Sequence, residues 1–277
     1  MNHILLKKLV RDALAEDLGM GDATTDSVFS ENERSSGSFK AKADGVLSGL
    51  DALKVVYEEF PGEVEVQLLK QDGDLVSKGD ILATVEGPVR ALLSGERVIL
   101  NIIQHLGGIA TATMEVISLL DDPTISVTDT RKTLPGLRAL QKYAVLSGGG
   151  KNHRFRLDDG VMIKDNHIKA AGSITKAVET VRANTGHMIK IEVETESKEQ
   201  VLEAVQLGVD VIMLDNRSPQ EVKELVELIP DEIIVEVSGG ITPGNIASYK
   251  GCGADIISLG WLTHSVKALD ISFNLNT

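Results

Sequence analysis

The strongest chemical signal in the sequence is a run of cationic side chains between residues 130 and 157. This segment has no Asp or Glu, and its basic residues are Arg131, Lys132, Arg138, Lys142, Lys151, His153, Arg154 and Arg156. Arg suits carboxylates and phosphates because its planar fork donates two parallel hydrogen bonds, whereas Lys acts as a point charge. A basic face in solvent is the alternative. Arg131 and Lys132 directly follow a β-rich run, however, and glycines 148–150 let a backbone approach a ligand closely. We therefore predict a pocket for a multiply charged anion.

Two Gly-rich turns near the C-terminus predict a phosphate site. Ser238-Gly239-Gly240 ends one β-rich run, and Thr242 and Pro243 then have the residue types of a helix N-cap and first turn. Backbone N–H groups at such a turn point towards an incoming anion. Ser258-Leu259-Gly260 ends the next run. Each turn alone is more often a plain connection, but a consecutive pair is a recurrent phosphate site of α/β barrels.

Carboxylates follow two neighbouring β-rich runs, at Glu194 and Asp215. Such groups can bind sugar hydroxyls, hold Mg²⁺ through water, or stabilise positive charge developing on a sugar ring, with helix capping as the alternative. Lys164 ends another run. Because an unpaired Lys is costly to bury, we expect its ammonium group to face a ligand.

A strand–helix alternation over the second half of the chain must position these residues. The β-rich runs cover residues 125–130, 160–166, 188–195, 209–216, 232–240 and 254–260. The helical stretches between them cover residues 173–186, 197–208, 218–230 and 242–251. This spacing predicts βαβ units and a parallel sheet, with the chemistry at the ends of the strands. Six runs are fewer than the eight strands of a full barrel.

The first part of the chain is organised differently. Residues 4–14 have helical spacing that stops near Gly19, and three strand-like segments follow between residues 38 and 87. They lack the exposed Lys turn of a biotin or lipoate carrier. Residues 92–120 are apolar on a helical period broken at Gly107-Gly108, which predicts two helices. We place the main boundary there: residues 1–108 with 266–277 form one domain, and residues 109–265 form the barrel.

The composition limits the partners. The net charge is −13, from 28 Lys and Arg against 41 Asp and Glu, and the sequence pI is about 4.9. An acidic chain with five Phe, three Tyr and one Trp is a poor nucleic-acid binder. Cys252 alone permits no intrachain disulfide or Cys-based zinc cluster. Neither a signal peptide nor an 18-residue apolar run is visible, so we expect a soluble cytoplasmic protein without nucleic-acid or membrane partners.

Several long segments, in order, resemble the quinolinate phosphoribosyltransferase family. They are DTRKTLPGLRALQKYAVLSGGGKNHR, LDDGVMIKDNHI, IEVETES, VIMLDN, EVSGGI and LGWLTHS, preceded by EDLGMGDATTD. The resemblance covers nearly the whole chain. It implies an N-terminal α/β sandwich domain and an incomplete α/β barrel of about six strands, the type II phosphoribosyltransferase fold. It also implies a homodimer with shared active sites, or a higher oligomer.

The resemblance further implies a reaction and its residues. Phosphoribosyl pyrophosphate and quinolinate would give nicotinate mononucleotide, pyrophosphate and CO₂, with Mg²⁺, in de novo NAD biosynthesis. Lys132, Lys164, Glu194 and Asp215 would be catalytic, and Mg²⁺ would lie near the last two, held mainly through the pyrophosphate. Arg97 would reach the quinolinate from the partner subunit. The implied substrate-binding set is Arg97, Thr130, Arg131, Lys132, His153, Arg154, Lys164, Glu194, Asp215, Ser238, Gly239, Gly240, Ser258, Leu259 and Gly260.

Two other functions remain open at this point. One is a molybdenum-associated relative of the same fold, whose motifs diverge in the stretch that corresponds to the intact residues 163–167 here. The other is a non-catalytic barrel that binds or senses anions. Retention of Glu194 and Asp215 beside the cationic set argues against the second alternative.

Overall fold

A computed structural model describes residues 1–276, which form two compact units. Unit 1 comprises residues 1–114, 133–149 and the chain from Leu262 onwards, and unit 2 comprises residues 115–132 and 150–261. The segment 133–149, from the basic run, thus belongs with unit 1. The domain boundary near residue 108 stays a prediction, and each compact unit is described below by itself.

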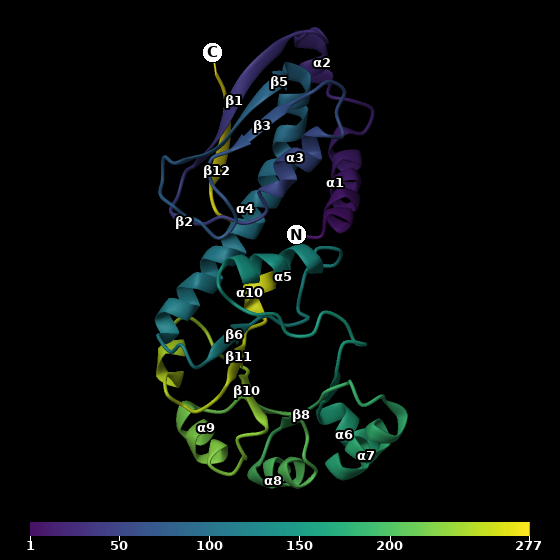
Figure 1. The fold of residues 1–277 in the computed structure, drawn as a ribbon, viewed down its shortest axis with the longest axis vertical. Helices are drawn as coiled ribbons and strands as arrows, with labels where there is room; N and C mark the ends of the chain where they lie inside the picture. The colour runs from purple at the N-terminus through teal and green to yellow at the C-terminus, as the bar shows by residue number, and fades with distance from the viewer. Residues whose placement is uncertain (277) are drawn as a thin grey trace. The chain divides into compact units, whose positions relative to one another are not determined.

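Unit 1 contains a four-stranded antiparallel sheet in the order β12-β1-β5-β3, with helices packed on it (Figure 1). Phe39 of β1 and Phe273 of β12 pair across the sheet, with ring centroids 4.8 Å apart. Leu6, Leu53 and Ile99 bury their side chains in the same core from three helices, which makes the predicted sandwich. The elements are α1 (His3–Leu18), α2 (Ala23–Val28), β1 (Arg34–Ala41), β2 (Gly45–Val46), α3 (Asp51–Tyr57), β3 (Glu65–Leu68), β4 (Leu75–Val76), β5 (Ile81–Pro88), α5 (Arg138–Ser147) and β12 (Ile271–Leu275), together with most of α4 (Val89–Leu120) and of α10 (Trp261–His264), which both cross the unit boundary.

The prediction of two helices between residues 92 and 120 is wrong, because α4 runs unbroken through Gly107 and Gly108. A Cβ atom on Gly108 would lie 2.3 Å from the backbone oxygen of Lys267. The glycine therefore serves close packing of another segment against the helix rather than a helix end. By length and composition α4 could cross a membrane, and half of its most apolar window is buried inside the structure.

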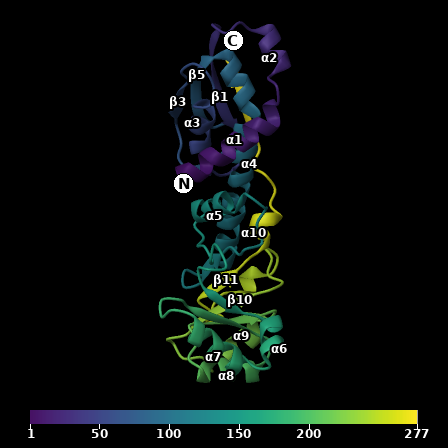
Figure 2. The same ribbon diagram turned by 90° about the vertical axis from the view of Figure 1, so that its right-hand side faces the viewer.

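Unit 2 is built on a six-stranded parallel sheet in the order β6-β11-β10-β9-β8-β7 (Figures 1 and 2). All six predicted strands are present. β6 and β7 are the two edges of this sheet, so the α/β barrel is incomplete, as predicted. The elements are β6 (Ser126–Thr128), β7 (Val161–Ile163), α6 (Asp165–Ala171), α7 (Ile174–Asn184), β8 (Ile191–Thr195), α8 (Lys198–Gln206), β9 (Val211–Asp215), α9 (Pro219–Val226), β10 (Ile234–Ser238), the 3-10 helix η1 (Ile246–Tyr249) and β11 (Ile256–Ser258).

Local sequence explains how the strands give way to helices in unit 2. The Ser173, Ser197 and Ser218 hydroxyls accept backbone N–H groups in the first turns of α7, α8 and α9. Each cap satisfies a donor that the helix cannot use internally and fixes where the helix begins. Within the strands, Ile212 and Leu214 are fully buried, whereas the alternate residues of β9 turn to the other face of the sheet. That other face carries the polar side chains of the candidate site.

Candidate active site

A cavity of about 600 Å³ lies at the carboxyl ends of the unit 2 strands. It brings together twelve of the predicted residues: Thr130, Arg131, Lys132, His153, Arg154, Lys164, Glu194, Asp215, Ser238, Gly239, Gly240 and Ser258. Met162, Met213, Asn216 and Glu236 also line it. Leu259 is buried rather than among the lining residues. Arg97 lies on α4 in unit 1, and its role in this site stays a prediction.

The turn that follows β6 carries Arg131 and Lys132. The Thr130 hydroxyl accepts the Lys132 backbone N–H at 3.0 Å, which closes this turn. Gly260, at the end of β11, leaves the room that the Lys132 side chain occupies. A Cβ atom there would lie 2.7 Å from Lys132 Cδ and 3.4 Å from the Thr130 hydroxyl oxygen. Because Gly260 has no side chain, Lys132 can occupy this position in the site.

Asp129, fully buried after β6, anchors the second cationic segment. One of its carboxylate oxygens accepts the His153 backbone N–H at 2.9 Å, and the other accepts the Asn152 amide at 2.6 Å. Arg154 donates from Nη1 to the Gly160 backbone oxygen at 2.6 Å. Burial, and then the charge of Arg131, lower the pKa of Arg154. The two guanidinium groups repel each other, and a bound anion would relieve that repulsion.

The acidic side of the cavity is formed by Glu194 and Asp215 at the ends of β8 and β9. Lys164 Nζ donates to Glu194 Oε2 at 2.9 Å. Burial, and then the charge of Glu194, raise the pKa of Asp215, while the Asn216 amide donates to the Asp215 carboxylate and lowers it. The site thus holds two carboxylates close enough to repel each other, and one of them is partly balanced by Lys164.

The predicted phosphate turn is present, but not at a helix start. Gly239 and Gly240 have φ of +88° and +65°, a conformation that favours glycine. The predicted helix over residues 242–251 is wrong, since only the 3-10 helix η1 forms there. Asn245 Oδ1 accepts the Thr242 backbone N–H at 2.7 Å, so Asn245 rather than Thr242 caps this turn. The conformation of the two glycines, not a helix dipole, shapes the turn.

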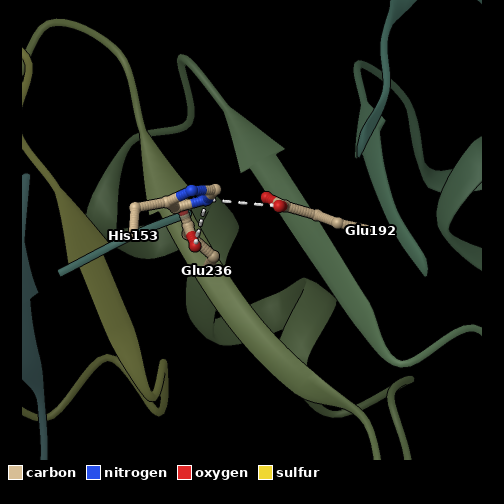
Figure 3. Close-up of side chains that lie close together, drawn as sticks. All are labelled: His153, Glu192 and Glu236. Atoms are coloured by element: carbon tan, nitrogen blue, oxygen red, sulfur yellow. Dashed lines mark ion pairs between the residues drawn. The ribbon is translucent and has the colours of Figure 1, made fainter. Parts of the chain in front are cut away.

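His153, which lines the cavity, approaches two buried carboxylates, those of Glu192 and Glu236 (Figure 3). Its Nε2 atom is 3.2 Å from Glu192 Oε2 and 3.5 Å from Glu236 Oε2. Burial would lower the pKa of His153, but hydrogen bonds to Glu192 and Glu236 and the charges of both raise it to about 10. Burial raises the pKa of Glu192. The three side chains therefore form one buried group, joined through His153 Nε2.

The spacing of this group would also suit a metal ion, because the three donor atoms lie within 4.8 Å of one another. His153 Nδ1, however, accepts the Arg154 backbone N–H at 2.8 Å, which places the ring proton on Nε2. A metal ion at Nε2 would displace this proton, and a neutral ring would then carry its proton on Nδ1, directly against the Arg154 N–H. The group is a hydrogen-bonded ion cluster.

Four acidic or amide residues of this site were not predicted from the sequence: Asp129, Glu192, Asn216 and Glu236. Glu192 and Glu236 interrupt apolar strands two residues before Glu194 and Ser238. The period of two in a strand puts each on the same face as the predicted residue, and this signal could have found them. Asp129 and Asn216 each adjoin a predicted residue, and only their contacts show what they do.

Comparisons with known proteins place this geometry in a family. The family models described as quinolinate phosphoribosyl transferase match residues 22–107 for the N-terminal domain and 109–274 for the C-terminal domain. A Bacillus subtilis protein, named probable nicotinate-nucleotide pyrophosphorylase (carboxylating), is 50% identical over 275 residues, which are 99% of this chain and 95% of that protein.

Solved structures agree with these matches. NadC from Streptococcus pyogenes superposes with a TM-score of 0.97 at 42% identity, covering 100% of this chain and 98% of the other. The nicotinate-nucleotide pyrophosphorylase from Francisella tularensis superposes with a TM-score of 0.95 at 34% identity and the same coverage.

Proposed function

Because this chain belongs to the quinolinate phosphoribosyltransferase family, we infer that it transfers a phosphoribosyl group from phosphoribosyl pyrophosphate to quinolinate with loss of CO₂. The products are nicotinate mononucleotide and pyrophosphate, and the reaction belongs to de novo NAD biosynthesis. One observation supports this reaction above all. A single cavity is lined by guanidinium and ammonium groups, by carboxylates and by a Gly-Gly turn.

The charges of the cavity match those of the substrates. Quinolinate is a dianion, and Arg131 and Arg154 repel each other in its absence. Each guanidinium group can donate two parallel hydrogen bonds to a carboxylate. The Ser238-Gly239-Gly240 turn offers backbone N–H groups to the 5-phosphate, as glycine-rich turns of barrels do. A net-acidic protein can therefore bind two polyanions at one local cationic site.

The proposed transfer needs no covalent intermediate on the protein. The quinolinate nitrogen attacks the anomeric carbon while the bond to pyrophosphate breaks, so positive charge develops on the ribose ring. Glu194 and Asp215 face this region, and their preorganised negative charge stabilises an oxocarbenium-like transition state. The repulsion that raises the pKa of Asp215 in the free enzyme is relieved as that charge develops.

Decarboxylation follows from the bond that has formed. The ring nitrogen is then quaternary and positive, and it stabilises the electron pair left on the adjacent carbon when the C–CO₂ bond breaks. A proton taken up at that carbon completes the product. The protein has to hold the carboxylate in a water-poor setting, and Met162 and Met213 supply apolar walls to the cavity.

Mg²⁺ is proposed as the cofactor, near Glu194 and Asp215 and held mainly through the pyrophosphate. The donors fit this ion, because both are carboxylate oxygens and their mutual repulsion would fall beside a dication. When bound, Mg²⁺ neutralises charge on the pyrophosphate and so improves it as a leaving group. The chain's own contribution is to orient the two carboxylates and to keep Lys164 beside them.

We also propose a cytoplasmic homodimer in which Arg97 reaches the quinolinate of the partner subunit. The exposed position of Arg97 on α4 supports this role, because an exposed guanidinium group is accessible to a second subunit. The acidic net charge supports solubility and argues against nucleic-acid partners.

One assay tests the proposed reaction. The protein is mixed with Mg²⁺, quinolinate and phosphoribosyl pyrophosphate, and nicotinate mononucleotide and CO₂ are measured, with nicotinate as the control substrate. We expect product from quinolinate and none from nicotinate, which lacks the second carboxylate. Absence of product, or equal use of nicotinate, would contradict the assignment and favour a non-catalytic anion-binding protein.

A further inference from the structure

Asn216 has a backbone conformation that few residues tolerate. Its φ is +54°, and among residues 1–276 only Asp121 shares a positive φ without being glycine. Asn and Asp adopt this left-handed region more readily than other side chains. Asn216 directly follows β9, and its side chain lines the cavity. The strained backbone thus holds one specific side chain in the site.

The contacts of Asn216 join two parts of the site. Its Nδ2 atom donates to the Asp215 carboxylate, and its backbone N–H donates to the Ser238 backbone oxygen at 2.8 Å. Its Oδ1 atom faces Gly239, where a Cβ atom would lie only 2.3 Å away. Asn216 is therefore wedged between the carboxylate at the end of β9 and the Gly-Gly turn at the end of β10.

We propose that Asn216 is a positioning residue that sets the spacing between the Asp215 carboxylate and the Ser238-Gly239-Gly240 turn, and so selects a donor carrying a ribose and a 5-phosphate. The inference rests on the proposed function. Register pairing of Asp215 with Ser238 aligns the two strands only up to their ends. Beyond the strand ends, the Asn216 amide and backbone N–H continue the alignment. The ribose hydroxyls and the 5-phosphate of one donor then meet partners at a constant separation.

The chemistry of this position explains why an amide suits it. The Asp215 carboxylate needs a donor, which the Nδ2 group supplies, and an Asp at 216 would instead add a second negative charge. The side chain must also be short enough to fit against Gly239. Gly239 has φ of +88°. Asn216 and Gly239 thus both have a positive φ, and the Asn216 side chain packs closely against the backbone of Gly239.

Asn216→Gly tests the inference, because glycine tolerates the backbone and removes only the side chain. We expect the KM for phosphoribosyl pyrophosphate to rise about tenfold, the loss expected for about one hydrogen bond to a charged group. The KM for quinolinate should change less than about twofold on the same scale. Calorimetric titration with ribose 5-phosphate, which needs no turnover, should show the same weakening. The matched control is Asp121→Gly, which removes the other non-Gly side chain at a positive φ and lies outside the cavity.

A second variant separates positioning from folding. Gly239→Ala forces a contact on the Asn216 side chain. In the double variant this side chain is absent, so the loss of donor binding should be smaller than the sum of the losses in the two single variants. Equal losses for both substrates, or losses that track a lowered Tm, would overturn the inference, as would unchanged binding of ribose 5-phosphate. Should Asn216→Gly not fold, Asn216→Asp keeps the side-chain size and should weaken donor binding further. Failure of the wild-type protein to turn over quinolinate would instead overturn the proposed function.

Discussion

Lys164 and Glu194 form an ion pair, with Nζ 2.9 Å from Oε2, across the ends of the neighbouring strands β7 and β8. From the sequence, both residues are predicted to contact substrates. In the free protein they are partners of each other, so an anion that recruits Lys164 must compete with a carboxylate. The pair therefore weakens non-productive anion binding and leaves Glu194 available once the substrates are present.

Removal of the Glu194 charge should strengthen anion binding and weaken turnover. We expect Glu194→Gln to bind quinolinate several-fold more tightly, because Lys164 no longer has a competing carboxylate, and to have a much lower kcat, because one stabilising charge is lost. Calorimetry without the second substrate measures the first effect and steady-state kinetics the second. Weaker quinolinate binding in this variant would show that Glu194 and the substrate do not compete for the Lys164 ammonium group.

Loss of a cation from the pocket should raise the quinolinate KM or lower kcat/KM. For Lys132→Ala and Arg154→Ala we expect a cost of roughly 1.5–3 kcal/mol or more, that of a charge-assisted hydrogen bond. Arg156→Ala is the matched control from the same basic segment, since its side chain is 71% exposed and paired with Asp158. Wild-type kinetics in both test variants would remove the cationic segment from the active site.

A methyl group at residue 260 should displace Lys132 without unfolding the protein. The added Cβ would lie 2.7 Å from Lys132 Cδ, a flexible part of that side chain, so we expect Gly260→Ala to lower kcat/KM by about tenfold with little change in Tm. Gly186→Ala is the control, because no atom lies within 4 Å of its added Cβ. A full loss of stability would instead show that the backbone at Gly260 moves.

The Asp215 charge should cost stability at neutral pH. Burial and Glu194 raise the pKa of Asp215, so the folded protein binds this proton more tightly than the unfolded chain does. The ionised group therefore opposes folding above its folded-state pKa, and the penalty vanishes as the pH falls below its usual value. We expect Asp215→Asn to have a higher Tm than wild type at pH 7.5 and an equal one at strongly acidic pH. A lower Tm at pH 7.5 would contradict this balance.

Shared active sites should allow two inactive variants to complement each other. In a mixture of Arg97→Ala and Lys132→Ala proteins, half of the dimers are hybrids after random exchange, and each hybrid has one intact site. About a quarter of the wild-type activity should return. Native mass spectrometry checks that subunits exchange. Exchange without recovered activity would show that Arg97 does not act across the interface.

Much of the site was predictable because β-strands translate sequence position directly into spatial position. The apolar runs marked the six strands, and the polar residues after them had to lie at one edge of a parallel sheet. Glu194, Asp215 and Ser238 were therefore placed together before any contact was known, and the cavity contains all three.

The wrong predictions arose where glycine or proline is compatible with two local structures. Gly107-Gly108 was interpreted as a helix break, yet α4 continues because the missing side chain at Gly108 makes room for the backbone of Lys267. Thr242-Pro243 has the residue types of a helix start, yet Asn245 accepts the Thr242 N–H and closes a short turn. In both places a partner distant along the chain, or a competing local hydrogen bond, decided the outcome.

The sequence by itself determined the alternation of strands and helices, the cationic segment and the residue types at the strand ends, because these depend on local periodicity and charge. Only the tertiary structure decided which charges meet. It paired Lys164 with Glu194, set His153 beside Glu192 and Glu236, and wedged Asn216 against Gly239. Those contacts depend on strand order and on distances of a few ångströms between residues far apart in the chain. Electrostatic energies and steric clearances change steeply over such distances, and local patterns do not encode them.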